Sequence, residues 1–518
     1  MLKMNWQRFR DFFKVNRIDE DHFVLGIDLG SATSSIAYFD PLRKDSEVLD
    51  ISGGYGKTST PTALQYIAEN AEWIFGEYAI LNANGDDAVL SDFVTKLGNS
   101  DYLDIGGEAK PAHEVCAIYI KELVANCRNI NPKAQIAGII SVVPDFISRE
   151  ARKSLKDAYL MAGFDDVLID MTEEREALLA YYLHNEQNKA DHRLMLLDFG
   201  ARGMRSSIYN ISGGKLDCLS AALDETLSTS VLDSSIYNLF CKYYCDNKKI
   251  DKLKLSKGEQ AGLLIFTHQH KDLLFQYDDG RDLKLYYNFP FPPFSQIVSF
   301  EDVYSIVAPI ERKIKEFIRG LIEKIPNNEK NIDVIIASGG GFEMSWARRR
   351  LSELFPDTAA YGNIKFYKNP KGILSEGASL LAASKLGVLP EININISDKH
   401  KIPWDIGINI TKEGQKRFYA IVERGSSVWQ KPKSIYAILQ DDDKKIDLIK
   451  RDSGGREIRI GAIVMDGLPQ RPAGTTKIAL SIAPVGINNY MINIKDLGFG
   501  EIFPASDFVY SKELKIDL

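Results

Sequence analysis

A short glycine-containing loop lies between two strand-like segments near the start of the chain. Residues 23–28 read Phe-Val-Leu-Gly-Ile-Asp, residues 29–34 read Leu-Gly-Ser-Ala-Thr-Ser, and a second apolar run begins at residue 35. Glycine lets the backbone approach a ligand closely, and successive N–H groups in such a turn form an anion-binding nest. A carboxylate at the strand end is the kind of ligand that holds Mg²⁺ through water. The loop therefore predicts phosphate binding by Asp28, Gly30, Ser31, Ala32 and Thr33.

Two later segments repeat the combination of a buried strand and glycines. Residues 196–203 read Leu-Leu-Asp-Phe-Gly-Ala-Arg-Gly, and residues 334–341 read Val-Ile-Ile-Ala-Ser-Gly-Gly-Gly at the start of a helix. The first loop leads into a strand rather than a helix and is not followed by G-x-G-x-x-G, which disfavours a dinucleotide-binding fold. We expect Asp198 to share a water-coordinated Mg²⁺ with Asp28. The further phosphate contacts are predicted at Gly200, Ala201, Arg202, Gly339, Gly340 and Gly341.

The elements that position these loops change in kind along the chain. From residue 22 to 388, short apolar strands alternate with longer helices, which is typical of an α/β domain. From residue 404 to 518, period-two apolar spacing between turns indicates an all-β sandwich, and residues 389–403 are the expected linker. Residues 1–21 carry apolar side chains at helical spacing among basic ones, which predicts an amphipathic helical extension.

Composition narrows the class of protein. The chain has 518 residues, of which 45% are apolar and 26% charged, as in a globular protein of several domains. No apolar run is long enough to span a bilayer, and no signal peptide opens the chain. The five cysteines are scattered without a Cys-x-x-Cys pair, which favours a reducing compartment, and a net charge of −7 gives no footprint for nucleic acid. We therefore expect a cytoplasmic protein without a transmembrane segment or a nucleic-acid partner.

Several segments in this order resemble the seventy-kilodalton heat-shock (DnaK-like) chaperone family. Beyond the three glycine loops, residues 143–146 (Val-Pro-Asp-Phe) and 172–181, with Glu173, Leu179 and Tyr181, resemble the stretch that joins the two lobes in that family. Residues 466–469 (Asp-Gly-Leu-Pro) and 495–496 (Lys-Asp) resemble its peptide-binding β-domain. Sugar kinases and actins share the hairpins but not this C-terminal part. The resemblance runs from about residue 23 to the end.

The resemblance implies a fold and a set of roles. The fold would be a two-lobed, actin-like (ribonuclease H-like) ATPase domain followed by a peptide-binding β-sandwich. ATP or ADP with Mg²⁺ would bind between the lobes, with Glu173, Asp198 and Lys96 as the catalytic residues. In the β-domain, Tyr436, Ile446 and Leu448 would line a groove for extended peptides, although inward-facing core positions show the same alternation. We expect the family's α-helical lid to be absent, in which case bound peptide would exchange quickly.

Other positions depart from the family. The second phosphate loop has Gly203 in place of a hydroxyl and Arg205 in place of an acid, so a charge is reversed beside the expected metal site. Glu343 stands where an arginine would stack on the base, and residues 259–266, aligned with the adenine helix, supply no lysine, arginine or serine. Losing a hydroxyl and inverting a charge should slow phosphoryl transfer by orders of magnitude.

Two functions follow from these features. One is an ATP-binding chaperone-like protein that holds unfolded or extended peptide segments, with weak or absent ATP hydrolysis. The alternative is a pseudo-ATPase that serves as a scaffold or adaptor for a dedicated protein partner. A third option, a regulator that shares co-chaperones with a true family member, cannot be read from the residues.

Overall fold

The computed structural model describes most of the chain, in segments separated by gaps. The predicted N-terminal helix, residues 1–21, lies outside the described part, as do residues 393, 395, 398–400 and 403 of the predicted linker 389–403. The described residues are 22–51, 57–82, 89–99, 101–105, 108–127, 135–145, 147–186, 191–213, 215–276, 282–287, 294–325, 331–392, 394, 396–397, 401–402, 404–412, 414–426, 428, 432–440, 445–452, 455–485 and 489–516.

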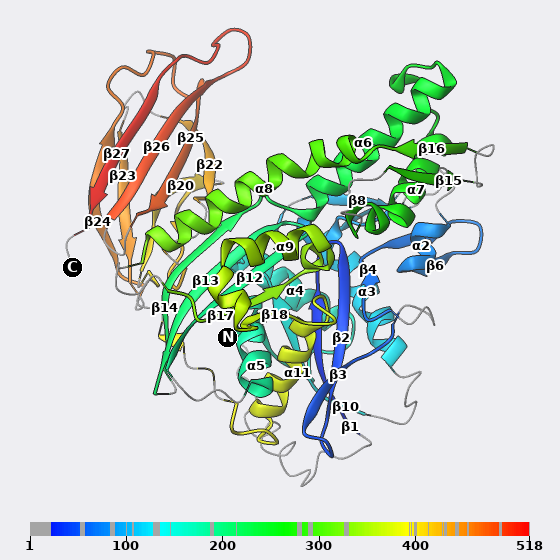
Figure 1. Cartoon of the computed structure of the whole chain (residues 1–518). Helices are drawn as coiled ribbons and strands as arrows, with labels where there is room; N and C mark the ends of the chain where they lie inside the picture. Colours follow the sequence, from blue (N-terminus) through cyan, green and yellow to red (C-terminus); the bar gives the residue numbers. More distant parts are fainter. Residues whose placement is uncertain are drawn as a thin grey trace. The chain divides into compact units, whose positions relative to one another are not determined.

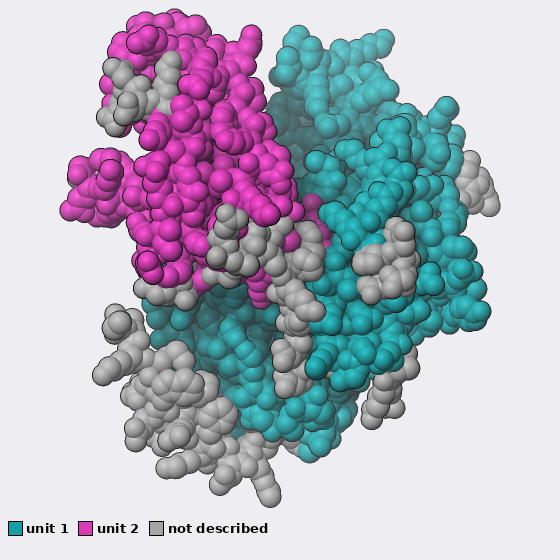
Figure 2. Space-filling model, turned by 90° about the vertical axis from the view of Figure 1, so that its left-hand side faces the viewer, with its two compact units in different colours: residues 1–220, 224–396 teal, residues 221–223, 397–518 magenta. Residues whose placement is uncertain are grey.

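The chain divides into two compact units, which Figure 2 distinguishes by colour. Unit 1 contains residues 1–220 and 224–396, and unit 2 contains residues 221–223 and 397–518. Unit 1 is mixed α/β and consists of two lobes, whereas the part of unit 2 from residue 405 onward is built from antiparallel sheets. The predicted fold class, actin-like α/β lobes followed by an all-β domain, is therefore confirmed. Within the described part, no helix is both long and apolar enough to cross a membrane.

The first lobe of unit 1 is centred on a sheet with the strand order β11-β10-β1-β2-β3, with β4 also paired to β2. β1 pairs in parallel with β10 and antiparallel with β2, so the first glycine loop turns between two neighbouring strands. The elements of this lobe are β1 (His22–Leu29), β2 (Thr33–Asp40), β3 (Asp45–Val48), β4 (Thr60–Pro61), β5 (Leu64–Ile67), β6 (Glu72–Phe75), α2 (Glu77–Leu81), β7 (Val89–Leu90), η1 (Phe93–Lys96), β8 (Tyr102–Ile105), β9 (Glu108–Pro111), α3 (Ala112–Cys127), β10 (Gln135–Val143), α4 (Arg149–Met161), β11 (Leu168–Glu173), α5 (Glu174–Asn185) and α11 (Ile373–Lys385).

The second lobe has a sheet with the order β18-β17-β12-β13-β14-β19 (Figure 1). Its elements are β12 (His192–Gly200), β13 (Gly203–Ser212), β14 (Lys215–Asp224), α6 (Thr229–Lys248), η2 (Lys252–Lys254), α7 (Lys257–Gln276), β15 (Leu283–Tyr287), β16 (Phe294–Val298), α8 (Phe300–Glu323), β17 (Val334–Ser338), η4 (Gly340–Glu343), α9 (Ser345–Leu354), α10 (Pro356–Ala360), β18 (Ile364–Phe366) and β19 (Ile396–Ser397).

The two central sheets share one plan. In each lobe an antiparallel hairpin, β1–β2 or β12–β13, lies beside a parallel strand, β10 or β17. β12 and β17 are near-continuous apolar runs that are buried along almost their whole length. Such runs are typical of strands covered on both faces. The shared plan places one glycine hairpin at the same point of each lobe.

Close packing of α11 against β1 fixes the first hairpin on the lobe. α11 lies against β1, β2 and α5 (Figure 1). A Cβ atom added to Gly26 in β1 would lie 2.0 Å from the carbonyl oxygen of Ser375 in α11. A side chain at residue 26 would therefore push the helix away from the strand.

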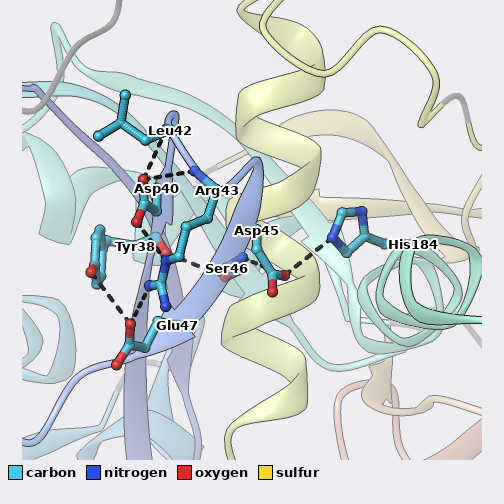
Figure 3. Close-up of polar contacts among 8 residues, drawn as sticks. All are labelled: Tyr38, Asp40, Leu42, Arg43, Asp45, Ser46, Glu47 and His184. Atoms are coloured by element: carbon cyan, nitrogen blue, oxygen red, sulfur yellow. Dashed lines mark hydrogen bonds and ion pairs between the residues drawn. The ribbon is translucent and has the colours of Figure 1, made fainter.

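The turn between β2 and β3 is held by charged side chains, drawn in Figure 3. Asp40 accepts hydrogen bonds from the backbone N–H groups of Leu42, at 2.8 Å, and Arg43, at 3.2 Å. The Arg43 side chain also pairs with Asp40, at 2.6 Å, and with Glu47. Asp45 lies 3.1 Å from Nε2 of His184, which comes from α5 (Figure 3). The turn is thereby tied to the helix beside it.

Unit 2 has two antiparallel sheets with a shared apolar core. One sheet has the order β21-β20-β23-β24 and the other β22-β25-β26-β27. Side chains from both sheets, including Ile406, Leu448, Ile478 and Tyr490, form one buried cluster. The strands are β20 (Asp405–Lys412), β21 (Gln415–Val422), β22 (Ser434–Leu439), β23 (Lys445–Arg451), β24 (Glu457–Val464), β25 (Thr476–Pro484), β26 (Asn489–Gly498) and β27 (Val509–Lys515).

Candidate functional site

The three glycine segments converge on one cavity in unit 1. Its volume is about 100 Å³, and its walls come from the β1–β2 hairpin, the β12–β13 hairpin and the start of η4. Eleven of the residues that the sequence assigned to phosphate or metal line it, and Gly341 is the one member of the three loops that does not. These eleven are Asp28, Gly30, Ser31, Ala32, Thr33, Asp198, Gly200, Ala201, Arg202, Gly339 and Gly340.

Two glycines at the start of η4, its N-cap Gly339 and Gly341, are required by their surroundings. Gly339 has φ of 87°, and an added Cβ would lie 2.6 Å from the carbonyl oxygen of Phe199 and 2.7 Å from Oδ1 of Asp198. Gly341 packs on the ring of Phe199, where an added Cβ would lie 2.1 Å from Cδ1. At Gly339 the backbone before η4 thus lies directly against the β12–β13 hairpin. Gly341 instead leaves room for the side chain of Phe199.

A larger cavity of about 780 Å³ adjoins the first and shares five wall residues with it: Ala32, Thr33, Ala201, Gly340 and Lys371. This volume lies within the usual range for small-molecule sites, about 300–1,000 Å³. The other wall residues come from α6, α7, η4 and α9 in the second lobe, and from α2 and the segment that leads into β4 in the first lobe. They include Lys57, Glu77, Thr229, Asp233, His268, Gln269, Glu343, Met344 and Arg348.

Ion pairs lie along the wall of the larger cavity. Glu77 of α2 pairs with Lys57 at 3.1 Å and with His268 of α7 at 3.2 Å, so it connects elements of both lobes. Burial raises the pKa of Glu77, but the charges of His268 and Lys57 outweigh it, and the net pKa is lowered. Glu343, in η4, is paired with Lys371 at 2.7 Å.

Several carboxylates lie in the wall of the small cavity. Asp28, Glu174 and Asp198 all line it, and withdrawal from water raises the pKa of each. For Asp28 the result is a pKa of about 7, with the charge of Asp198 adding to the effect and that of Arg205 opposing it. Asp145, near the same group, has its pKa raised to about 6, mainly by burial.

Arg205 lies among these acids. β12 and β13 place it directly across the ladder from Asp198, so that both side chains leave the same face of the hairpin. Its Nη1 atom is 3.5 Å from Oδ2 of Asp198 and 3.1 Å from Oε2 of Glu174. All three side chains are about nine-tenths buried. The guanidinium therefore compensates carboxylates that would otherwise repel one another.

The predicted catalytic residues other than Asp198 lie elsewhere. Glu173 is the N-cap of α5, and its Oε2 accepts hydrogen bonds from Arg175, with Nε 2.8 Å away, so it does not line the cavity. Lys96 ends η1 and pairs with Asp92 at 2.8 Å, while Val94 of the same turn lines the cavity. The structure thus brings Asp198 to the cavity, and neither Glu173 nor Lys96.

The surroundings of Asp28 and Asp198 do not suit a resident Mg²⁺ ion. Mg²⁺ needs octahedral oxygen ligands at about 2.0–2.1 Å, most of them waters. In this site the guanidinium of Arg205 faces Asp198 and Glu174 directly, and its positive charge opposes a second cation there. The donor set therefore does not fit the metal that the resemblance implies.

The residues predicted to bind peptide fall on two different sheets. Tyr436 lies on β22 and is 68% exposed. Ile446 and Leu448 lie on β23 in the opposite sheet, and Leu448 is buried in the core shared by the two sheets. The structure therefore does not bring these three side chains together on one surface.

The wall residues that the sequence analysis did not find include Glu174, His268 and Gln269. Glu174 follows directly after the predicted Glu173, and one position along a helix start turns a side chain by about 100°. His268 and Gln269 lie on α7 beyond residues 259–266, where the sequence analysis had placed the adenine helix.

Fold and site together define a class of protein. An actin-like domain with paired glycine hairpins around a cleft, followed by an antiparallel β-domain, is the architecture of DnaK-type chaperones. Comparisons with known proteins agree. The chain is 23% identical over 510 residues to the "Chaperone protein DnaK" of Thermotoga maritima, a match that covers 93% of this chain and 80% of that protein. It is 24% identical over 502 residues to the "Chaperone protein DnaK" of Thermosipho melanesiensis, covering 92% and 79%.

The chain is a distant homologue of the DnaK (heat-shock protein 70) chaperones. Two family descriptions match parts of it. Residues 46–256 match the "Family of unknown function (DUF5716) C-terminal", and residues 401–516 match a "Domain of unknown function (DUF8552)". The second match falls within the β-sandwich, and the first spans the β12–β13 hairpin of the cavity.

Proposed function

We propose that this protein is a chaperone relative that binds ATP or ADP in the cleft of unit 1 and holds extended peptide segments on unit 2, in the cytoplasm, with weak or absent ATP hydrolysis. The observation that carries the proposal is the convergence of three glycine segments on one cavity. Backbone N–H groups from such loops suit phosphate oxygens. The adjoining cavity has the volume that a nucleoside requires.

Slow hydrolysis is supported by the groups around the phosphates. Gly203 offers no hydroxyl, and Arg205 pairs with Asp198 and Glu174, which removes acids that would otherwise hold a metal ion or a water. Removing one group that stabilises a transition state typically costs about 10²–10³ in rate. ATP hydrolysis should therefore be weak or absent.

Calorimetric titration of ATP and ADP into the full-length protein tests binding, and phosphate release tests turnover. We expect saturable binding of both nucleotides and little phosphate release. The double variant Gly203→Thr with Arg205→Asp restores the hydroxyl and the acid, and it should release phosphate faster than the wild type. The absence of nucleotide binding under all conditions would overturn the proposal.

The peptide part rests on the edge strand β22. Tyr436 and Ile438 are 68% and 43% exposed. Because they are two positions apart on the strand, their side chains lie on the same face of it. An extended peptide that pairs with such an edge gains main-chain hydrogen bonds, and exposed apolar side chains add preference. Tyr436→Ala should weaken binding of a fluorescent apolar peptide in an anisotropy titration. Tyr361→Ala, which removes a tyrosine 82% exposed on unit 1, is the matched control and should leave binding unchanged.

A pseudo-ATPase scaffold for a dedicated protein partner is the second candidate. The ion pairs of Arg205 with Asp198 and Glu174, and of Lys371 with Glu343, favour it, because they satisfy charges that a ligand would otherwise neutralise. Nucleotide titration separates the two functions. A scaffold of this kind would bind neither ATP nor ADP, yet would recover a specific protein partner from its own host.

A further inference from the structure

Arg205 has a fixed place in the cavity wall. Its position opposite Asp198 follows from the β12–β13 register, and its residue exposure is 8%. The guanidinium lies within 3.5 Å of carboxylates on two different elements, Asp198 on β12 and Glu174 at the start of α5. Asp28, at the end of β1, also attracts it electrostatically. A positive charge is thus built in where acids from both hairpins converge.

Two arginines of the β12–β13 hairpin, Arg202 and Arg205, line the cavity. Arg202 is an exposed residue, and Glu225 and Glu174 attract it electrostatically. Guanidinium groups bind phosphate oxygens through several N–H donors at once. The hairpin therefore offers two cationic groups to a phosphate.

From this arrangement we infer that the Arg205 guanidinium replaces the divalent metal ion, so that the cleft binds nucleoside di- or triphosphate without Mg²⁺. The inference rests on the nucleotide binding proposed above and names the ionic form of the ligand. Two features support it: a cation already pairs with two of the carboxylates, and its charge opposes the binding of a second cation beside them. Arg202 and the backbone N–H groups of residues 30–33 are then left to contact the phosphates.

The test is a calorimetric titration of ADP into the full-length protein, in excess EDTA and again in excess MgCl₂. We expect the two dissociation constants to agree within about threefold, which is less than 1 kcal/mol of binding free energy. Binding that requires Mg²⁺ would overturn the inference and leave the proposed nucleotide-binding function standing. Absence of ADP binding in both buffers would overturn both. This comparison needs no variant, so it does not depend on how a substitution folds.

The variant Arg205→Gln provides a second test of the inference. It should weaken ADP binding in EDTA by about 10–100-fold, the scale expected when charge-assisted hydrogen bonds of about 1.5–3 kcal/mol are lost. Because the carboxylates are then freed from the guanidinium, MgCl₂ should recover part of the loss. Arg319→Gln is the matched control, since this arginine is exposed on α8 and pairs only with Glu323 among the described residues, at 3.6 Å. If Arg205→Gln in EDTA binds ADP as tightly as Arg319→Gln, the inference is wrong.

Discussion

Asp496→Asn should destabilise unit 2 by about 3–5 kcal/mol, the usual cost of breaking a buried ion pair by removing one partner. The Asp496 and Arg471 side chains are 0% and 6% exposed, and two parallel hydrogen bonds of 2.8 Å join them. Asp496 also accepts hydrogen bonds from the backbone N–H of Gly498, at 2.9 Å, and from the N–H and hydroxyl of Ser506, at 2.8 and 2.7 Å. An asparagine would present an NH₂ group to some of these donors and leave Arg471 buried without a counter-charge.

Hydrogen exchange followed by mass spectrometry is the suitable assay, because a chain of two compact units has no single unfolding transition. Peptides from β25 and β26 report the free energy of opening of unit 2. The matched control is Asp447→Asn, which breaks an ion pair of 2.9 Å with Arg459 in the same unit. There both side chains are more than half exposed, so the expected cost is at most about 1 kcal/mol. Equal effects of the two substitutions would refute the reasoning.

The same ion pair predicts a pH dependence. Hydrogen bonds from Arg471 hold the pKa of Asp496 well below its ordinary value of 3.8, and burial opposes them only in part. Because the folded-state pKa is depressed, the stabilisation is fully present above the unfolded-state pKa. It is lost as the pH falls through the folded-state value. Protection of β26 should therefore drop in acid for the wild type more steeply than for Asp496→Asn.

Two further predictions concern unit 1. Burial, with the charges of Asp45 and Glu47, raises the pKa of Glu376 from 4.5 to about 8. The stability of unit 1 should therefore fall by up to about 5 kcal/mol as the pH rises through that window, and Glu376→Gln should flatten this slope when hydrogen exchange of peptides from α11 is followed at several pH values. Gly339→Ala should cost at least about 2 kcal/mol and weaken ADP binding, because φ is 87° and the added Cβ meets Phe199. Gly362→Ala, with positive φ but open space around the added atom, should cost only about 1 kcal/mol in the same hydrogen-exchange assay and spare binding.

The fold could be predicted because its evidence is periodic and local. Strands and helices alternate up to α11, and period-two spacing begins with β20, so the two fold classes are visible in the residues themselves. The meeting of Asp28 and Asp198 was also predictable. Each ends the first strand of a glycine hairpin, and the two lobes repeat one strand plan. Loops at equivalent positions of facing lobes lie across the same cleft.

The finer placement could not be predicted, because it depends on three-dimensional neighbours. Glu173 and Glu174 differ by one position at the start of α5, yet one caps the helix and the other faces Arg205. Alternation along β23 and β22 tells which residues face inward or outward. It does not tell that Tyr436 and Leu448 belong to opposite sheets. Such differences arise from packing, on which a single sequence carries little direct information.

Arg205 changes what the acidic residues of the cavity mean. In the sequence, Asp28 and Asp198 predicted a metal site, and Arg205 indicated a reversed charge beside that site. In the structure, the arginine and the acids depend on each other, because a buried guanidinium without counter-charges would be costly, and so would converging carboxylates without a cation. The acids therefore do not by themselves argue for hydrolysis, since neutralising Arg205 is a sufficient reason for Glu174 and Asp198 to be there. What still supports the proposed nucleotide binding is the backbone of the glycine loops, which line the cavity.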